Sequence, residues 1–287
     1  MKTKYVFSAL LISTLALALT ALAQENGIAF VTDVKGDAAL DAGKATLMAE
    51  VKKGARISCT RECAVGVMYL ISGKEYVLKG PGDFLVGDSE VIAKIGPPPT
   101  MRDTNWKVSS KVVAQVAQTS SASIRMRSLG GAPKSELAQP LAERLIYPRD
   151  TSVATLQPAF RWTSSNPKGP FEFELKANAG AKSVYKAKSN ATSLALPKNI
   201  KLQPDAEYRW MVKAGGSEVG ATTFKTLPTH SLDLTHKRKP DDKAPFSDWL
   251  LYALTLKDMG ADQDAGEIWA KLAKERPDLP ELATLAK

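Results

Sequence analysis

Two cysteines, Cys59 and Cys63, are the residues of this chain whose chemistry depends most directly on their spacing. A close pair can form a structural disulfide, act as a redox-active pair, remain as free thiols or supply at best half of a zinc site. Segments 54–58 and 64–69 read as strands, so 60–62 would form a three-residue hairpin tip that brings the two Cα atoms near bridging range. We expect a structural disulfide between Cys59 and Cys63.

The first 23 residues predict the compartment in which these thiols are found. Lys2 and Lys4 precede an uncharged run of mainly Leu and Ala at 6–19, and the small residues of 21–23 follow it. This is the pattern of a Sec-type export signal that is cleaved after Ala23. No cysteine follows the run, which argues against a lipoprotein anchor, and the run is too short for a permanent span. We therefore expect a periplasmic protein with no stable membrane span after cleavage.

Charge is moderate and unevenly distributed. The formal net charge is +9, and removal of the predicted signal with its two lysines leaves +7. Segments 101–149 and 150–228 each carry +5, which would favour anionic partners such as lipid headgroups or cell-wall polymers. No clustered basic run contains interleaved aromatic residues, so a nucleic-acid partner is not expected.

The histidines do not predict a catalytic or metal site. His230, Asp233 and His236 have a spacing that a metal clip could use, but segment 229–243 reads as a linker without the supporting residues that ligands need. Neither histidine accompanies a Ser or Cys nucleophile in an elbow-like context. We therefore expect no catalytic residues, no metal and no cofactor, and we interpret the chain as a protein that is not an enzyme.

Segment 24–96 is expected to form a small β domain. Short apolar runs alternate with glycine turns, which is typical of a sandwich or barrel of hairpins. The expected strands lie at 28–31, 56–59, 64–71, 75–78, 83–86 and 90–95.

Three motifs give this segment a family resemblance. Residues 51–57 read V-x-x-G-A-x-I, a strand opened by small residues follows at 64–67, and an S-G-x-x-Y-x-L hairpin leads into a G-P-G turn at 72–82. The segment resembles the FecR-type periplasmic domain, and this resemblance implies a periplasmic β module used for contact. In signalling members of that family a membrane span leads to a cytoplasmic segment that controls a sigma factor. A cleavable signal without such a segment departs from that plan, so sigma-factor control is not carried over.

Segment 97–139 reads as a connector. The prolines of 97–99 end the β domain because proline cannot donate to a strand ladder and stiffens the chain. A short helix is expected at 103–118, followed by a strand-like stretch at 124–127. Arg125 and Arg127 would share one face of that strand, either as candidate partner-binding residues or as charges that protect an exposed edge.

Segment 140–228 is expected to be a second β unit. Its apolar and polar residues alternate at intervals typical of a sandwich, and it resembles a fibronectin type III-like domain, with Trp162 as the core aromatic and Tyr208 at a tyrosine corner. Trp162 and Trp210 either pack in the core, which we favour, or form a carbohydrate-stacking platform. The expected strands lie at 158–162, 171–175, 183–185, 193–196, 208–212 and 221–224.

Segment 244–287 resembles one tetratricopeptide repeat. The match is carried by small residues where two helices approach, aromatic residues that fill the groove, and a proline that ends the second helix. These residues are Trp249, Ala253, Leu256, Gly260, Ala265, Trp269 and Pro277. One repeat cannot form a stable solenoid, so the hairpin either docks on the preceding sandwich or joins a partner's repeats. Trp249, Leu256 and Trp269 are the candidate partner-binding residues, and a short capping helix is expected near Pro280 and 282–285.

The expected fold is mainly β, with two small β domains followed by a C-terminal α-helical hairpin. From these modules we expect a non-enzymatic periplasmic adaptor or scaffold of a Gram-negative bacterium that binds envelope or periplasmic proteins, with envelope signalling as one use. The alternative is a cell-wall or glycan-binding module that binds peptidoglycan, which would require exposed Trp or Tyr beside the basic middle of the chain.

Overall fold

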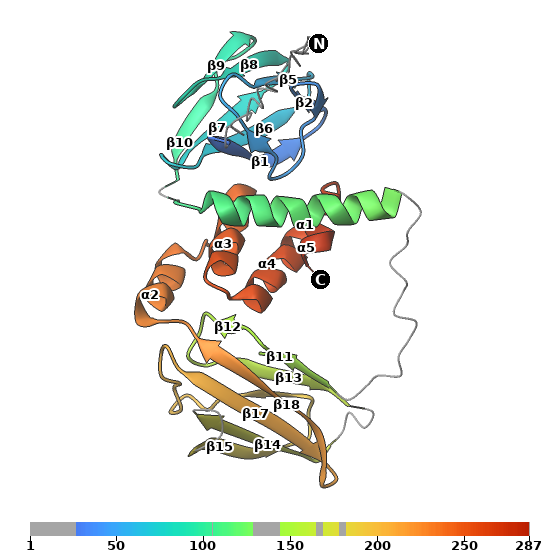
Figure 1. Cartoon of the computed structure of the whole chain (residues 1–287), viewed down its shortest axis with the longest axis vertical. Helices are drawn as coiled ribbons and strands as arrows, with labels where there is room; N and C mark the ends of the chain where they lie inside the picture. Colours follow the sequence, from blue (N-terminus) through green and yellow to red (C-terminus); the bar gives the residue numbers. More distant parts are fainter. Residues whose placement is uncertain (1–26, 105, 129–143, 165–168, 178–181, 287) are drawn as a thin grey trace, which may run out of the picture.

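The computed structural model describes residues 27–104, 106–128, 144–164, 169–177 and 182–286. Two β units lie at opposite ends of the molecule, and a layer of helices lies between them (Figure 1). The fold is mainly β, as predicted, with several sheets and a group of C-terminal helices. Within the described ranges, no helix has the length and apolar character needed to cross a membrane. The expected export signal at 1–23 lies outside the described residues.

The first β unit consists of two five-stranded sheets with orders β10-β7-β6-β1-β4 and β3-β2-β5-β8-β9. Alternating side chains of both sheets point inward, and Val31, Val67 and Ile57 are fully buried between them. The strands are β1 (Ala29–Lys35), β2 (Ala38–Leu40), β3 (Gly43–Lys44), β4 (Glu50–Val51), β5 (Arg56–Cys59), β6 (Ala64–Tyr69), β7 (Lys74–Lys79), β8 (Gly82–Val86), β9 (Val91–Ile95) and β10 (Thr100–Asp103).

The cysteines lie at a corner between these sheets. The structure places their sulfur atoms at disulfide distance, 1.98 Å, with the two Cα atoms 5.4 Å apart, which agrees with the expected pairing. The expected hairpin between them is wrong, however, because β5 pairs with β2 and β8 whereas β6 pairs with β1 and β7. The turn at 60–62 therefore carries the chain from one sheet to the other, so the cysteine pair joins the two layers.

The segment expected to be a connector is largely structured. Strand β10 extends the first sheet at its edge by pairing with β7. Helix α1 (Ser110–Ser128) begins later than expected and continues through the stretch that was expected to be a strand. Buried Val112, Val113 and Val116 recur at helical spacing and hold this helix in the apolar core, which is the reason that the helix forms.

The second β unit has a three-stranded sheet, β11-β13-β16, and a five-stranded sheet, β12-β18-β17-β14-β15. Its core contains Phe160, Trp162 and Trp210, whose rings pack at tilted or edge-on angles. The backbone N–H of Gln203 donates to the Tyr208 hydroxyl at 2.7 Å, which is the contact expected of a tyrosine corner. The strands are β11 (Arg144–Tyr147), β12 (Ser152–Val153), β13 (Ala159–Thr163), β14 (Phe171–Ala177), β15 (Lys182–Ser189), β16 (Ser193–Ala195), β17 (Glu207–Ala214) and β18 (Ser217–Thr226).

The remaining helices are α2 (Thr229–Arg238), α3 (Phe246–Asp258), α4 (Asp262–Glu275) and α5 (Pro280–Leu285). The expected hairpin is present in α3 and α4, with Gly260 at a φ of 74° between them, where a residue without a Cβ is favoured. The expected linker at 229–243 instead contains α2, because Leu232 and Thr235 are buried on one helical face.

The helical layer shares one apolar core with the first β unit. Helix α3 contacts β1, and α1 packs against both α3 and α5. An ion pair and a hydrogen bond at the rim reinforce this contact, since Arg276 binds the Asp33 carboxylate at 2.6 Å and donates to the Val34 carbonyl at 2.6 Å. On the other side, the Ser152 N–H of the second unit donates to the Gly260 carbonyl at 3.0 Å. The last segment of the chain thus joins the two β units.

Candidate functional site

The three candidate partner-binding residues of the hairpin are buried within the chain itself. Trp249, Leu256 and Trp269 are 6%, 2% and 3% exposed. Trp249 packs edge-on against Tyr252, and the Lys271 amine lies 3.9 Å from the centre of its ring. A partner cannot contact these side chains in this structure. The reason is that α3 packs against α1 and β1, while α4 packs against α3, α5 and β12. The sequence pattern of one repeat does not reveal these neighbours.

Arg125 and Arg127 do not form the expected strand face. The backbone at both positions belongs to α1, and residues two apart in a helix do not face one another. Their side chains lie outside the described part of the structure.

The tryptophans do not offer a platform for sugar stacking. Trp162 and Trp210 are 2% and 0% exposed, and the indole N–H of Trp210 donates to the Pro148 carbonyl at 2.7 Å. Together with Trp106, Trp249 and Trp269, all five tryptophans of the chain are buried. Core packing, the favoured interpretation of Trp162 and Trp210, is therefore correct.

The residues of the suggested metal clip lie on α2. Among the described residues, no group of three or more His, Cys, Asp and Glu side chains could hold a metal ion.

A buried polar cluster joins the first β unit to the hairpin. Glu75 is 2% exposed and accepts hydrogen bonds from the Thr32 hydroxyl at 2.5 Å and from Arg102 at 2.5 Å. Arg102 also donates to Ser247 and Asp248 at 2.8 Å each. Burial opposes the charge of Arg102, but the hydrogen bond to Asp248 and the charge of Glu75 raise its pKa. The bonds from Arg102 to Ser247 and Asp248, and from Ser247 to Glu75, hold α3 on the sheet.

A second polar cluster joins the hairpin to the second β unit. Asp264 of α4 accepts hydrogen bonds from the Tyr147 hydroxyl at 2.6 Å and from the Ala154 N–H at 2.7 Å. Burial raises the pKa of Asp264, and these two hydrogen bonds oppose that rise. Burial and the neighbouring Asp264 charge raise the pKa of Tyr147. Like the first cluster, this one binds parts of the chain to each other.

Residues that line a hollow of about 540 Å³ beside α2 also bind other parts of the chain. The Arg238 guanidinium lies 5.4 Å from the centre of the Trp106 ring. Asp248, which also lines the hollow, already binds Arg102.

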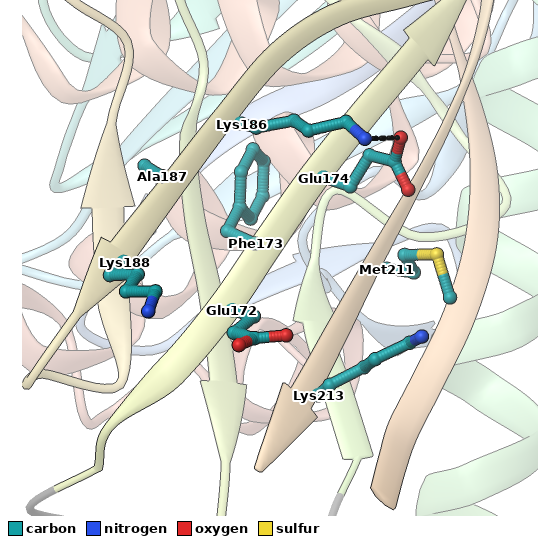
Figure 2. A pocket seen from close by; sticks show the side chains of 8 residues that line it. All are labelled: Glu172, Phe173, Glu174, Lys186, Ala187, Lys188, Met211 and Lys213. Carbon is teal, nitrogen blue, oxygen red and sulfur yellow. Dashed lines mark ion pairs between the residues drawn. The ribbon is translucent and has the colours of Figure 1, made fainter. Parts of the chain in front are cut away.

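The best candidate for a binding site is a hollow of about 470 Å³ on the outer face of the five-stranded sheet in the second unit. Strands β14, β15 and β17 form it, and their outward side chains alternate with residues such as Phe173 that point into the core. Figure 2 shows Glu172 and Glu174 on the central strand, with basic side chains on the strands at either side. The lining residues are Glu172, Phe173, Glu174, Lys186, Ala187, Lys188, Met211 and Lys213.

The charges of this hollow are only partly compensated within it. Glu174 binds Lys186 at 3.1 Å and Lys176 at 3.6 Å, and the hydrogen bond from Lys186 is the main reason that the pKa of Glu174 is lowered. Glu172 stands opposite Lys188 on β15 and Lys213 on β17. Neither of these two lysines forms an ion pair with another described residue. The lining thus contains two glutamates and three lysines, so the hollow favours an anionic ligand.

The hollow has the chemistry of a binding surface. Its charged groups are carboxylates and amines, and Met211 supplies an adaptable apolar surface. Sequence reasoning missed the site because pairing between strands brings its residues together. The signal that could have found it is the alternation of apolar residues and Lys in 185–188 beside that of Phe and Glu in 171–174.

A comparison of the chain with the models of known protein families and with curated proteins finds no match to either.

Proposed function

We propose that this chain is a non-enzymatic periplasmic adaptor that binds another envelope protein through the outer face of its second β unit. The observation that carries the proposal is the hollow on that face, where lysines outnumber the glutamates that they face. Export by the signal at 1–23, with cleavage after Ala23, is part of the proposal. The helical hairpin acts as an internal joint that fixes the distance between the two β units.

The same proposal includes the two domain resemblances. A three-stranded sheet that faces a larger sheet, together with the Tyr208 corner, supports a fibronectin type III-like second unit. The FecR-type resemblance of the first unit rests on its glycine turns and strand motifs. In this scheme the first unit is a contact module, and a role in envelope signalling would pass through protein contacts.

Peptidoglycan binding is the alternative that the basic hollow keeps open. The tryptophan platform that would support this alternative is absent from the surface of the described structure, because the rings of Trp162 and Trp210 are in the core. Sedimentation of the purified chain with peptidoglycan separates the two functions: co-sedimentation that a Lys188→Glu/Lys213→Glu variant loses would favour the cell-wall function over the adaptor.

Site-specific crosslinking in the cells that make the protein tests the adaptor function. A photoreactive phenylalanine derivative replaces Met211 in the hollow or, as the matched control, Lys198, which is exposed between β16 and β17 of the same unit. We expect a discrete adduct of one envelope protein from position 211 and none from position 198. Equal adducts at both positions, or none at position 211, would contradict a partner-binding role for the hollow.

A further inference from the structure

Strand β15 forms an open edge beside the hollow. It is the last strand of its sheet and, among the described strands, pairs with β14 alone. An edge strand presents unpaired backbone N–H and C=O groups that can accept another extended chain. The eight residues of β15 are exposed or half-buried along the whole strand. The edge is therefore long enough and open enough to pair with a further strand.

Charge defines which chain fits this edge. Lys186 and Lys188 lie two residues apart, so both point to the face that carries the hollow. Lys213 adds a third amine across β14, and Lys176 adds a fourth beside Glu174. A second copy of β15 would place lysines against lysines, which is unfavourable. The neighbour that complements this edge is acidic.

We propose that β15 binds an extended acidic peptide segment of a partner protein as an additional strand, with acidic side chains of that segment directed toward the hollow. This inference deepens the proposed function and rests on it. Acidic residues at alternate positions of an extended segment are separated by roughly 6.6 Å, the same repeat as that of Lys186 and Lys188. Cross-strand neighbours on one face then bring each carboxylate next to an amine.

A peptide fits these observations better than an anionic glycan does. A peptide offers backbone donors and acceptors at the spacing of the β15 edge, whereas a glycan has no backbone N–H and C=O groups that repeat at this spacing. The two ligands therefore differ in whether binding requires main-chain hydrogen bonds.

Titration of the purified full chain with synthetic peptides tests the proposal. The probe is an eight-residue peptide of alternating Thr and Glu with blocked ends and a fluorescent label, and anisotropy reports binding. We expect saturable binding that weakens with salt, and no binding of a peptide with Gln in place of each Glu. A peptide that is N-methylated at every residue keeps its charges but cannot donate, and we expect it not to bind. Equal binding of the N-methylated peptide would overturn strand addition.

Reversing the charge of two lysines on β15 tests whether the peptide binds at this edge. Lys186→Glu/Lys188→Glu converts two attractive cross-strand pairs into repulsive ones, which should weaken binding by about tenfold. The same variant should gain affinity for a peptide of alternating Thr and Lys. The matched control, Lys198→Glu/Lys201→Glu, makes the same change in net charge at exposed positions of the same unit and should leave binding unchanged. Circular dichroism of both variants verifies that each remains folded.

The outcomes distinguish this inference from the proposed function. An equal loss in both variants would overturn the assignment to β15, because only net charge would then matter. Binding of soluble polygalacturonate, lost on charge reversal, without binding of any peptide would overturn the acidic peptide in favour of a glycan. If no peptide binds while the crosslink at position 211 persists, the acidic peptide is wrong and the adaptor function stands.

Discussion

Replacement of Arg102 by alanine is the most direct test of how the helical layer is held on the first β unit. The change leaves the Glu75 carboxylate, 2% exposed, with the hydroxyl groups of Thr32 and Ser247 as its remaining partners among the described residues. Removal of one partner of a buried ion pair costs about 3–5 kcal/mol. Because the Arg102 side chain is itself 32% exposed, we expect a loss near the lower end, about 3 kcal/mol.

Thermal unfolding followed by tryptophan fluorescence measures this loss. At about 2–4 °C per kcal/mol for a protein of this size, the melting temperature should fall by roughly 6–12 °C. A second variant, Arg102→Ala/Glu75→Gln, removes the uncompensated charge and should recover part of the loss. Asp88→Ala is the matched control, because it breaks an ion pair whose side chains are 62% and 75% exposed, and such pairs contribute about 0–1 kcal/mol.

A fall in melting temperature no larger than that of the control would refute the reasoning. A double variant that is less stable than Arg102→Ala would also refute it, because the unpaired charge of Glu75 would then not be the cause of the lost stability.

Three other regions give further predictions. Burial raises the pKa of Asp264, so the folded state binds this proton more readily than the unfolded state does. The contribution of this proton to stability is largest below about pH 4 and declines as the pH rises through the folded pKa. The melting temperature of the wild type relative to that of Asp264→Asn should therefore fall between pH 3 and 7, and a constant difference would contradict this. Cys59 and Cys63 should resist thiol labelling in native, unreduced protein, and Cys59→Ser/Cys63→Ser should cost at most roughly 2 kcal/mol, because the closed loop is short; labelling of both residues would show the bond to be absent. Deletion of 244–287 should expose the apolar faces of α1 and β1, so that the protein aggregates or loses its main melting transition; an unchanged transition would show that the hairpin does not share the core.

Local pattern was sufficient to predict most strands of both β units. The expected strand at 56–59 coincides with β5, and that at 171–175 lies within β14. In such segments the alternation of apolar and polar residues records which face is buried, and glycine marks the turns. The short strands β3 and β4 have no such alternation because each contains two residues.

Contacts between distant parts of the chain were not predictable in the same way. The apolar face of the hairpin indicated that a neighbour was needed, and the expected neighbours were the preceding sandwich or a partner's repeats. In the structure α3 packs against α1 and β1, and α4 packs against α5 and β12 of the sandwich. Cys59 and Cys63 could be paired from their spacing, while the sheets to which their strands belong depend on β1, β2, β7 and β8. The candidate site was missed for a related reason, since Glu172, Lys188 and Lys213 lie on three separate strands.

The bond between Arg276 and Asp33 spans 243 residues of the chain, and this separation has a consequence for biosynthesis. A ribosome makes the first β unit long before it makes the helices that cover one side of that unit. During that interval the face that later receives α3 stays open to chaperones and proteases. A product of premature termination that ends before α3 would keep this face exposed and would be a good substrate for degradation. The chain therefore covers this face only after α3 has been made, and it adds the contact from Arg276 to Asp33 only after α4 has been made.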